Sequence, residues 1–214
     1  MQLRATGLGR LDAAIGGFNA ARTQVLTSTA AVVAGAMALD KADDACATGS
    51  ASRAAAVRPP ARAAGGKVRT AVAALPLLLR AYGRAADELA AAAKAATSLD
   101  AGQRAAIDAV VTGGRAEAAA ADAFRVAGRT AWPAYDQLND QQSLWLDRAS
   151  SGWYRDRQEA ANAYAVLLTD LRPALDRART LLQRVDAARR PISERERGAL
   201  ARADTALATL RSPG

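Results

Sequence analysis

One long heptad pattern constrains what this chain can fold into more than any other feature. Between residues 161 and 185, eight apolar residues follow one another at alternating steps of three and four. This spacing places them on one narrow stripe of an α-helix, and such a stripe has to pack against other helices. The pattern therefore predicts a helix with a buried apolar seam. The eight residues are Ala161, Tyr164, Leu168, Leu171, Leu175, Ala178, Leu182 and Val185.

Similar seams recur along the chain and predict an all-α fold. We expect an elongated antiparallel bundle of four long helices with a short fifth helix at the C-terminus. The first seam contains Arg22, which either reaches out to solvent or sets the helix register against an acid on a neighbouring helix. Trp132-Pro133 is expected to break or bend a helix, and Arg190-Pro191 to end one, because proline disrupts a helix interior. Ser193 and Glu196 have the spacing of a capping box that would open the last helix.

Length and composition favour a single helical-bundle domain over residues 1–214. The chain is long enough for a core, but aromatic residues make up only 4% of it, so the core must be built mainly from Ala and Leu. Residues 47–66 contain Pro59-Pro60 and Gly65-Gly66 among small residues. We expect a flexible basic linker there.

Several classes of chemistry lack their usual residues. The chain has no histidine and one cysteine, Cys46, so histidine-based catalysis, histidine metal sites and an intrachain disulfide are all excluded. We predict no catalytic residue, no metal site and no cofactor. The apolar run Val25–Leu39 is interpreted as helix core rather than as a signal peptide or a membrane span. We expect a cytoplasmic protein or, alternatively, one exported without a cleavable signal peptide.

Aromatic residues are concentrated in one part of the sequence. Six of the nine lie between positions 132 and 164. Trp and Tyr dominate protein-binding hot spots, and they also fill wide gaps between helices where Ala is too small. Both interpretations stay open, and the candidates for partner binding are Trp132, Tyr135, Trp145, Trp153 and Tyr154.

The charge of the chain is also unevenly distributed. The formal net charge is +8, and no acidic residue occurs between Asp44 and Asp87. A basic segment of this kind can bind phosphates or acidic lipids, or it can simply be a solvated surface. The candidates for anion binding are Arg53, Arg58, Arg62, Lys67 and Arg69.

Two short polar motifs could in principle bind a metal. The first holds the acids Asp40, Asp43 and Asp44, and the second holds Asn139, Ser143 and Asp147 at four-residue spacing. Together they resemble the two metal motifs of class I terpene synthases, which implies an all-α magnesium enzyme that binds diphosphate. The first motif is reversed relative to that family, the second ends in Asp rather than Glu, and the chain is far shorter.

We expect a non-enzymatic helical scaffold or adaptor that mediates protein–protein interaction, including self-association. Binding of nucleic acid or an acidic membrane through residues 53–84 is a second hypothesis. A third hypothesis is a helical cargo of a type VII-like secretion system, which long helical hairpins and an actinobacterial-like composition would suit. The Trp-x-Gly turn of such cargo is not present between the helices, where the sequence reads Ser151-Gly152-Trp153. The magnesium enzyme is the fourth. No small-molecule substrate is predicted.

Overall fold

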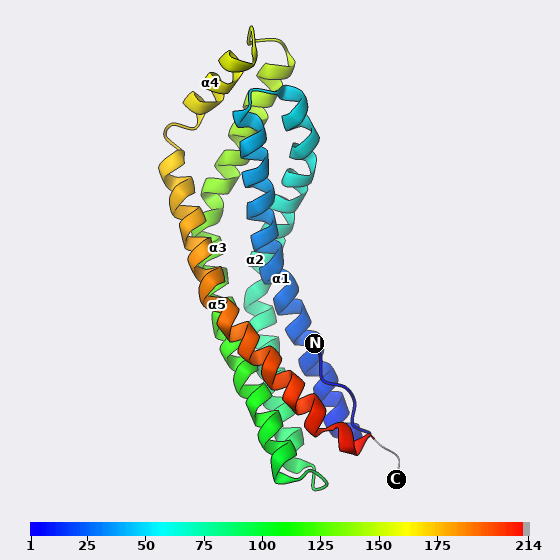
Figure 1. Cartoon of the computed structure of the whole chain (residues 1–214). Coiled ribbons are helices and arrows are strands. Elements are labelled where there is room, and N and C mark those ends of the chain that lie inside the picture. Colours follow the sequence, from blue (N-terminus) through cyan, green and yellow to red (C-terminus); the bar gives the residue numbers. More distant parts are fainter. Residues whose placement is uncertain (212–214) are drawn as a thin grey trace. The chain divides into compact units, whose positions relative to one another are not determined.

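Within the residues that the structure describes, all the regular secondary structure is helical. A computed structural model describes residues 1–211, and within this range it contains five α-helices and one 3₁₀-helix but no strand (Figure 1). The helices pack against one another, so the predicted all-α class is confirmed. The elements are α1 (Gly9–Ala47), α2 (Ala51–Ala95), α3 (Ala101–Ser150), α4 (Arg157–Leu167), α5 (Arg172–Ala206) and η1 (Ala208–Leu210).

The helices divide into two compact units, each described here by itself. Unit 1 comprises Met1–Thr27, Ala74–Phe124 and Val185–Gly214, of which residues 185–211 are described. Unit 2 comprises Ser28–Ala73 and Arg125–Arg184. Each of α1, α2, α3 and α5 contributes residues to both units, because the seams continue along the full helices.

The core of unit 1 is built from apolar residues that recur at steps of three and four along the helices. The rings of Phe18 and Tyr82 lie 5.3 Å apart at its centre. Gly114 of α3 lies against both rings, and a methyl group there would come within 2.9 Å of Phe18 Cε2. The absence of a side chain at residue 114 therefore lets α3 approach α1 and α2 closely. Other fully buried members are Leu11, Ile15, Leu89, Ile107, Val110, Leu200, Ala203 and Leu207.

The core of unit 2 holds four of the seven aromatic residues that are buried within residues 1–211. The indole of Trp145 packs edge-on against Tyr164, with ring centroids 5.5 Å apart, and its Nε1–H donates to the carbonyl of Ala160. The indole of Trp132 lies over two glycines, since methyl groups added to Gly35 and Gly65 would be 3.5 and 3.7 Å from it. Both distances are ordinary van der Waals contact, so the indole fits against these positions with or without a methyl group. A methyl group at Gly35 would instead overlap Val68 of α2, so Gly35 lets α1 approach α2 closely.

The predicted linker at about 47–66 is wrong. Only Thr48–Ser50 connects α1 to α2, with Gly49 in the left-handed region at φ +69°. From Ala51 onward the segment is helical, and its buried residues continue the α2 seam toward the N-terminus. Because most of them are Ala or Gly, the period is hard to recognise in the sequence. These residues are Ala54, Arg58, Ala61, Gly65 and Val68.

The predicted helix end at Pro191 is wrong, and the helix is not broken at Pro133 either. α3 runs through Pro133, and α5 runs through Pro191. Proline has no N–H, so the carbonyls four residues earlier, of Arg129 and Ala187, have no donor within the helix. Both prolines and both of these residues are exposed, so water can bind the carbonyls instead. The helix predicted from residue 153 to about 189 is interrupted at a different place, in the turn 168–171 between α4 and α5. Pro173 is the second residue of α5, just after this turn. The seam residues Leu168 and Leu171 stay buried in that turn.

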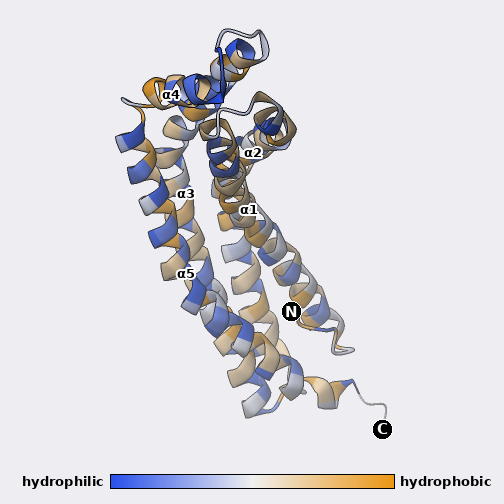
Figure 2. Cartoon of the chain, turned by 45° about the horizontal axis from the view of Figure 1, so that its top comes forward, coloured by the Kyte–Doolittle hydropathy of each residue, from blue (hydrophilic) through white to orange (hydrophobic). Residues whose placement is uncertain are grey.

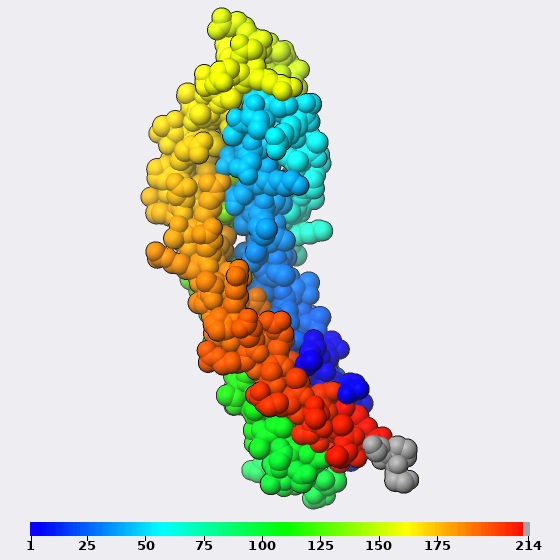
Figure 3. Space-filling model, in the orientation of Figure 1, coloured from blue at the N-terminus to red at the C-terminus, as the bar shows by residue number. Residues whose placement is uncertain are grey.

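The two ends of the described chain meet in unit 1. Asp204 accepts hydrogen bonds from Arg4, at 2.6 Å, and from Arg211, at 2.7 Å. Arg211 also donates to the carbonyl of Ala5. The N-terminal residues lie directly beside the red end of the chain in Figure 3. These bonds attach the segment before α1 to the C-terminal part of α5.

One helix within residues 1–211 is long and apolar enough to cross a membrane. This helix is α1, and the core helix of a globular protein meets the same criterion. Val25, Val32 and Leu39 of the apolar run are buried against other helices, as expected of a core helix. Apolar and polar residues alternate along all the long helices, α1 included (Figure 2).

We predict that Gly114→Ala lowers the free energy of unfolding by about 1–3 kcal/mol, because its methyl group overlaps Phe18 and the Tyr82 hydroxyl. Gly83→Ala is the matched control, since nothing lies within 4 Å of a methyl group there. Alanine should stabilise that helix position by up to about 1 kcal/mol. Urea unfolding measures both changes, and effects of the same sign and size would contradict the close packing at Gly114.

We predict that Asp204 makes the fold sensitive to acid. Hydrogen bonds from Arg4, with help from Arg211, lower the pKa of Asp204 from 3.8 to about 2. A carboxyl group with a lowered pKa stabilises the fold above its unfolded pKa, and this stabilisation is lost as the pH falls from 3.8 toward 2. Asp204→Asn should therefore lose less unfolding free energy than the wild type between pH 5 and pH 2 in denaturant titrations. Parallel losses in the two proteins would contradict this role.

Candidate functional site

A network of acids, tyrosines and one arginine lies inside unit 2. Arg179 of α5 donates through Nε to Asp40 at 2.9 Å and through Nη2 to Asp43 at 2.8 Å, both on α1. Tyr164 donates to Asp43 at 2.8 Å, and Tyr135 donates to Asp40 at 3.4 Å. The two carboxylates therefore share one guanidinium and two hydroxyl groups.

The protonation of this network is set mainly by burial. Burial raises the pKa of Asp40 although Arg179 opposes the shift. Burial, followed by the neighbouring carboxylates, raises the pKa values of Tyr135 and Tyr164, so both phenols stay neutral. Burial also raises the pKa of the Cys46 thiol to about 12. A thiol with so high a pKa is a poor nucleophile at neutral pH.

Unit 1 contains a second buried network, centred on Glu196 of α5. Arg22 of α1 donates through Nε to Glu196 at 2.9 Å, and Tyr82 of α2 donates to the same carboxylate at 2.5 Å. Glu196 is fully buried, and the Arg22 side chain is only 6% exposed. The predicted capping box is therefore wrong, because Glu196 bonds to other helices rather than to the backbone near Ser193. Arg22 instead sets the register against an acid, which was one of its two interpretations.

A further buried acid in unit 1 completes the second network. Glu117 of α3 accepts from Arg189 Nε at 2.6 Å and from the Ser193 hydroxyl at 2.6 Å. The guanidinium of Arg189 also lies 5.6 Å from the centre of the Phe124 ring. Glu117 is fully buried, so these contacts are needed to offset the cost of keeping its negative charge away from water.

The buried acids of both units are thus engaged by arginine and hydroxyl groups. Asp40 and Asp43 bind Arg179, and Asn139 accepts from Arg58 Nη2 at 3.2 Å. Within residues 1–211, no group of three Asp, Glu or Cys side chains is arranged to hold a metal ion. Four of the six residues that resemble terpene synthase motifs thus contact basic side chains of the protein itself. They are Asp40, Asp43, Asn139 and Ser143.

The aromatic candidates separate into core and surface residues. Trp132, Tyr135 and Trp145 are at most 6% exposed, so they belong to the core and are not available as a contact surface. Trp153 is 68% exposed, and its neighbour Tyr154 is half-buried. Partner binding by Trp153 and Tyr154 stays a prediction.

Trp153 is held by a well-defined helix ending. Gly152 has φ +74°, its N–H bonds to the carbonyl of Ala149, and the Trp153 N–H bonds to the carbonyl of Arg148. This is a Schellman motif. The Arg148 guanidinium lies 5.4 Å from the centre of the Trp153 ring. The exposed indole therefore has a fixed backbone and a stacked cation beneath it.

The basic candidates do not form one continuous surface. At 3.6 residues per turn, positions 58, 62 and 69 fall on one side of α2, whereas positions 53 and 67 fall on the other. Arg69 is paired with Asp136 of α3 at 3.3 Å. Arg58 is buried, while Arg53, Arg62 and Lys67 are exposed. Arg58 and Arg62 both line a pocket of about 600 Å³ between α2 and α3 of unit 2.

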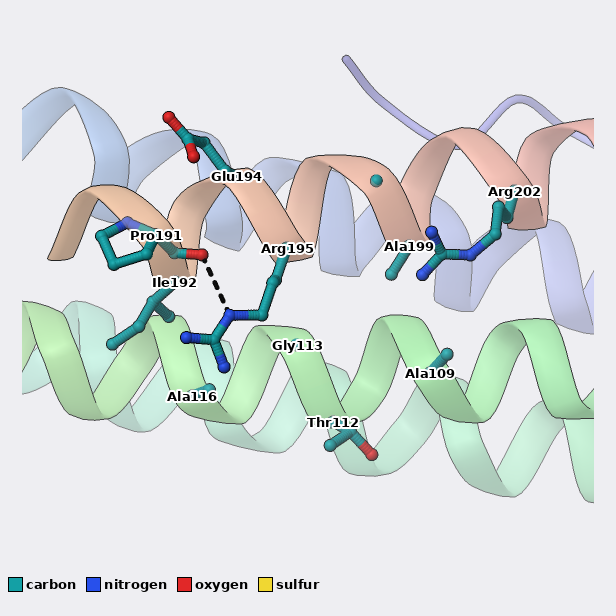
Figure 4. A pocket seen from close by; sticks show the side chains of 11 residues that line it. Ala109, Thr112, Gly113, Ala116, Pro191, Ile192, Glu194, Arg195, Ala199 and Arg202 are labelled. Carbon is teal, nitrogen blue, oxygen red and sulfur yellow. Dashed lines mark hydrogen bonds between the residues drawn. The ribbon is translucent and has the colours of Figure 1, made fainter.

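A second pocket, of about 710 Å³, lies between α3 and α5 in unit 1 (Figure 4). Its α3 wall consists of small residues such as Gly113 and Ala116. Arg195 extends toward α3 and donates to the Pro191 carbonyl at 3.3 Å, whereas Glu194 points away from α3. Arg195 and Glu194 are both exposed, so this groove holds no desolvated polar group.

Comparison of the chain with known protein families, with curated proteins and with solved structures finds no significant match to any of them.

Sequence reasoning missed Glu117 and its partner Arg189, and it assigned Glu196 to a capping box rather than to the acid that Arg22 meets. A usable signal was present, because both acids occupy seam positions: Glu117 lies between Gly114 and Ala121, and Glu196 lies four residues before Leu200. A charged residue at a seam position indicates a buried ion pair.

We predict that Arg22→Met lowers the free energy of unfolding by about 3–5 kcal/mol, because it leaves the buried Glu196 carboxylate without its cation. The double variant Arg22→Met/Glu196→Gln should recover most of this loss, since it removes the charge and keeps an acceptor for Tyr82. Denaturant unfolding measures both variants.

Arg115→Ala is the matched control for this prediction. Arg115 and Asp87 form an ion pair at 2.6 Å, but their side chains are 59% and 66% exposed. Removing an exposed pair should cost about 0–1 kcal/mol. A loss for Arg22→Met no larger than that of Arg115→Ala would contradict the role of Arg22 in the core.

Proposed function

We propose that this protein is a non-enzymatic helical scaffold or adaptor whose four long helices form an antiparallel bundle. Support comes from the buried acids, which bind arginine and tyrosine side chains and so are not free to exchange protons with a substrate. Enzymes generally need a titratable group in a cleft that can change its protonation state. The fold is better suited to presenting helix and turn surfaces to a protein partner or to a second copy of the chain.

The observation that carries this proposal is the exposed indole of Trp153. A large apolar side chain at 68% exposure costs solvation free energy, while the Schellman turn and Arg148 restrict its movement. Trp and Arg are the residue types most enriched in binding hot spots, and a pre-ordered side chain loses little entropy on binding. We therefore propose that the turn around Trp153 is the partner-contacting surface.

We predict that Trp153→Ala reduces recovery of the specific protein partner at least about tenfold, since a central tryptophan is worth about 2 kcal/mol or more in an interface. The full-length protein, immobilised through a C-terminal tag, would be compared with the variant by quantitative mass spectrometry of bound host proteins. Analytical ultracentrifugation of the same two proteins measures self-association. Because Trp153 is exposed, the stability of the fold should change by less than about 0.5 kcal/mol.

Leu77→Ala is the matched control, because Leu77 of α2 is a comparably exposed apolar residue, at 65%. It should leave both partner recovery and self-association unchanged. Equal results for wild type, Trp153→Ala and Leu77→Ala in both measurements would contradict the proposed surface.

A further inference from the structure

Arg58 differs from every other buried charged side chain of residues 1–211. Arg22, Asp43, Glu117 and Glu196 are each ion-paired across a helix interface. Arg58 is 8% exposed, yet within residues 1–211 no carboxylate lies within ion-pair distance of it.

The hydrogen bonds of Arg58 are also incomplete. Its Nη2 donates to Ser143 Oγ at 2.6 Å and to Asn139 Oδ1 at 3.2 Å, both neutral acceptors on α3. Its Nε is buried and has no acceptor. A buried guanidinium normally obtains its compensation from a carboxylate or phosphate, which takes two parallel N–H bonds. The described residues 1–211 do not supply that group to Arg58.

The surroundings of Arg58 make an anion favourable. Arg62, one helical turn further along α2, lines the same pocket and is exposed to solvent. Burial, and to a lesser degree repulsion from Arg62, lowers the pKa of Arg58. Asp147 is the single carboxylate among the residues that line the pocket, and it too is exposed. The pocket is thus lined by two guanidinium groups, of Arg58 and Arg62, and by one solvent-exposed carboxylate, of Asp147.

We propose that the pocket between α2 and α3 binds a phosphate monoester group, with Arg58 and Arg62 as its ligands. A phosphate monoester carries about −1.5 to −2 charges at neutral pH, which matches two guanidinium groups better than one carboxylate does. A pocket of about 600 Å³ leaves room for the organic part of a small molecule or for a lipid headgroup.

An extended polyanion fits this site less well. Arg69, the next basic residue on the same side of α2, is already paired with Asp136, and Arg53 and Lys67 lie on the other side. A duplex or a bilayer surface would need a continuous row of free cations. The phosphate site is independent of the proposed protein contact at Trp153, because the two rest on different residues and different variants.

Isothermal titration of the full-length protein with inorganic phosphate, and then with glycerol 3-phosphate, tests the site. We expect saturable binding to the wild type, and Arg62→Ala should raise the Kd at least about tenfold. The nitrogen-15 NMR spectrum should show a phosphate-dependent shift of one arginine Nε–H signal that is absent from Arg58→Lys. Failure of the wild type to bind either compound up to about 10 mM would overturn the proposal.

Arg53→Ala is the matched control, since Arg53 is an exposed arginine of the same helix outside the pocket. It removes the same charge as Arg62→Ala but should change the Kd by less than about twofold. Equal weakening by the two variants would mean that phosphate responds only to net charge, and would overturn the site.

Vesicles distinguish the two sources of the phosphate group. Phosphatidic acid presents a phosphate monoester, whereas phosphatidylglycerol presents a diester at the membrane surface. Preferential binding to phosphatidic acid vesicles that is lost in Arg62→Ala would assign the site to a lipid headgroup. Binding of glycerol 3-phosphate without vesicle binding would assign it to a soluble metabolite. Equal binding to both vesicle types, unaffected by Arg62→Ala and without binding of free phosphate, would overturn the proposal.

Discussion

Burying an ionised side chain costs free energy that an opposite charge can offset, and the arrangement of these helices depends largely on that constraint. A core of Ala and Leu offers few polar atoms, so most buried charged residues meet a partner of opposite charge on another helix, with Arg58 as the exception. Arg22 meets Glu196, and Asp43 meets Arg179. A shift of one helix along another would separate these pairs while the apolar seams could still touch. We therefore interpret the ion pairs as the groups that fix helix register.

The heptad spacing was sufficient to predict the fold class, because apolar seams at steps of three and four recur along the chain and each can pack against another. Proline and glycine were misleading. In a long helix, proline is tolerated on the solvent side, where water binds the carbonyl that loses its partner, as at Pro133 and Pro191. Gly65 looked like part of a linker but lies in the core against Trp132. The effect of a proline or glycine in a helix depends on whether it lies on the solvent side or the core side. Composition alone does not reveal that side.

The candidate sites were predictable in part. Arg58 and Arg62 were recognised as basic residues in a region without acids, but their shared pocket depends on α2 being helical there. The buried networks were missed for a different reason. A charged seam residue indicates that an ion pair exists, but its partner lies as many as 174 residues away, as between Arg22 and Glu196. Finding that partner requires knowing which seams face each other.

The distribution of tryptophan has a spectroscopic consequence. All three indoles, at positions 132, 145 and 153, belong to unit 2, whereas the aromatic core of unit 1 consists of Phe18, Tyr82 and Phe124. Indole fluorescence therefore monitors unit 2 alone, while circular dichroism at 222 nm, a wavelength set by the peptide group, monitors the helices of both units. The chain thus carries its own selective probe of whether the two units melt together or in succession.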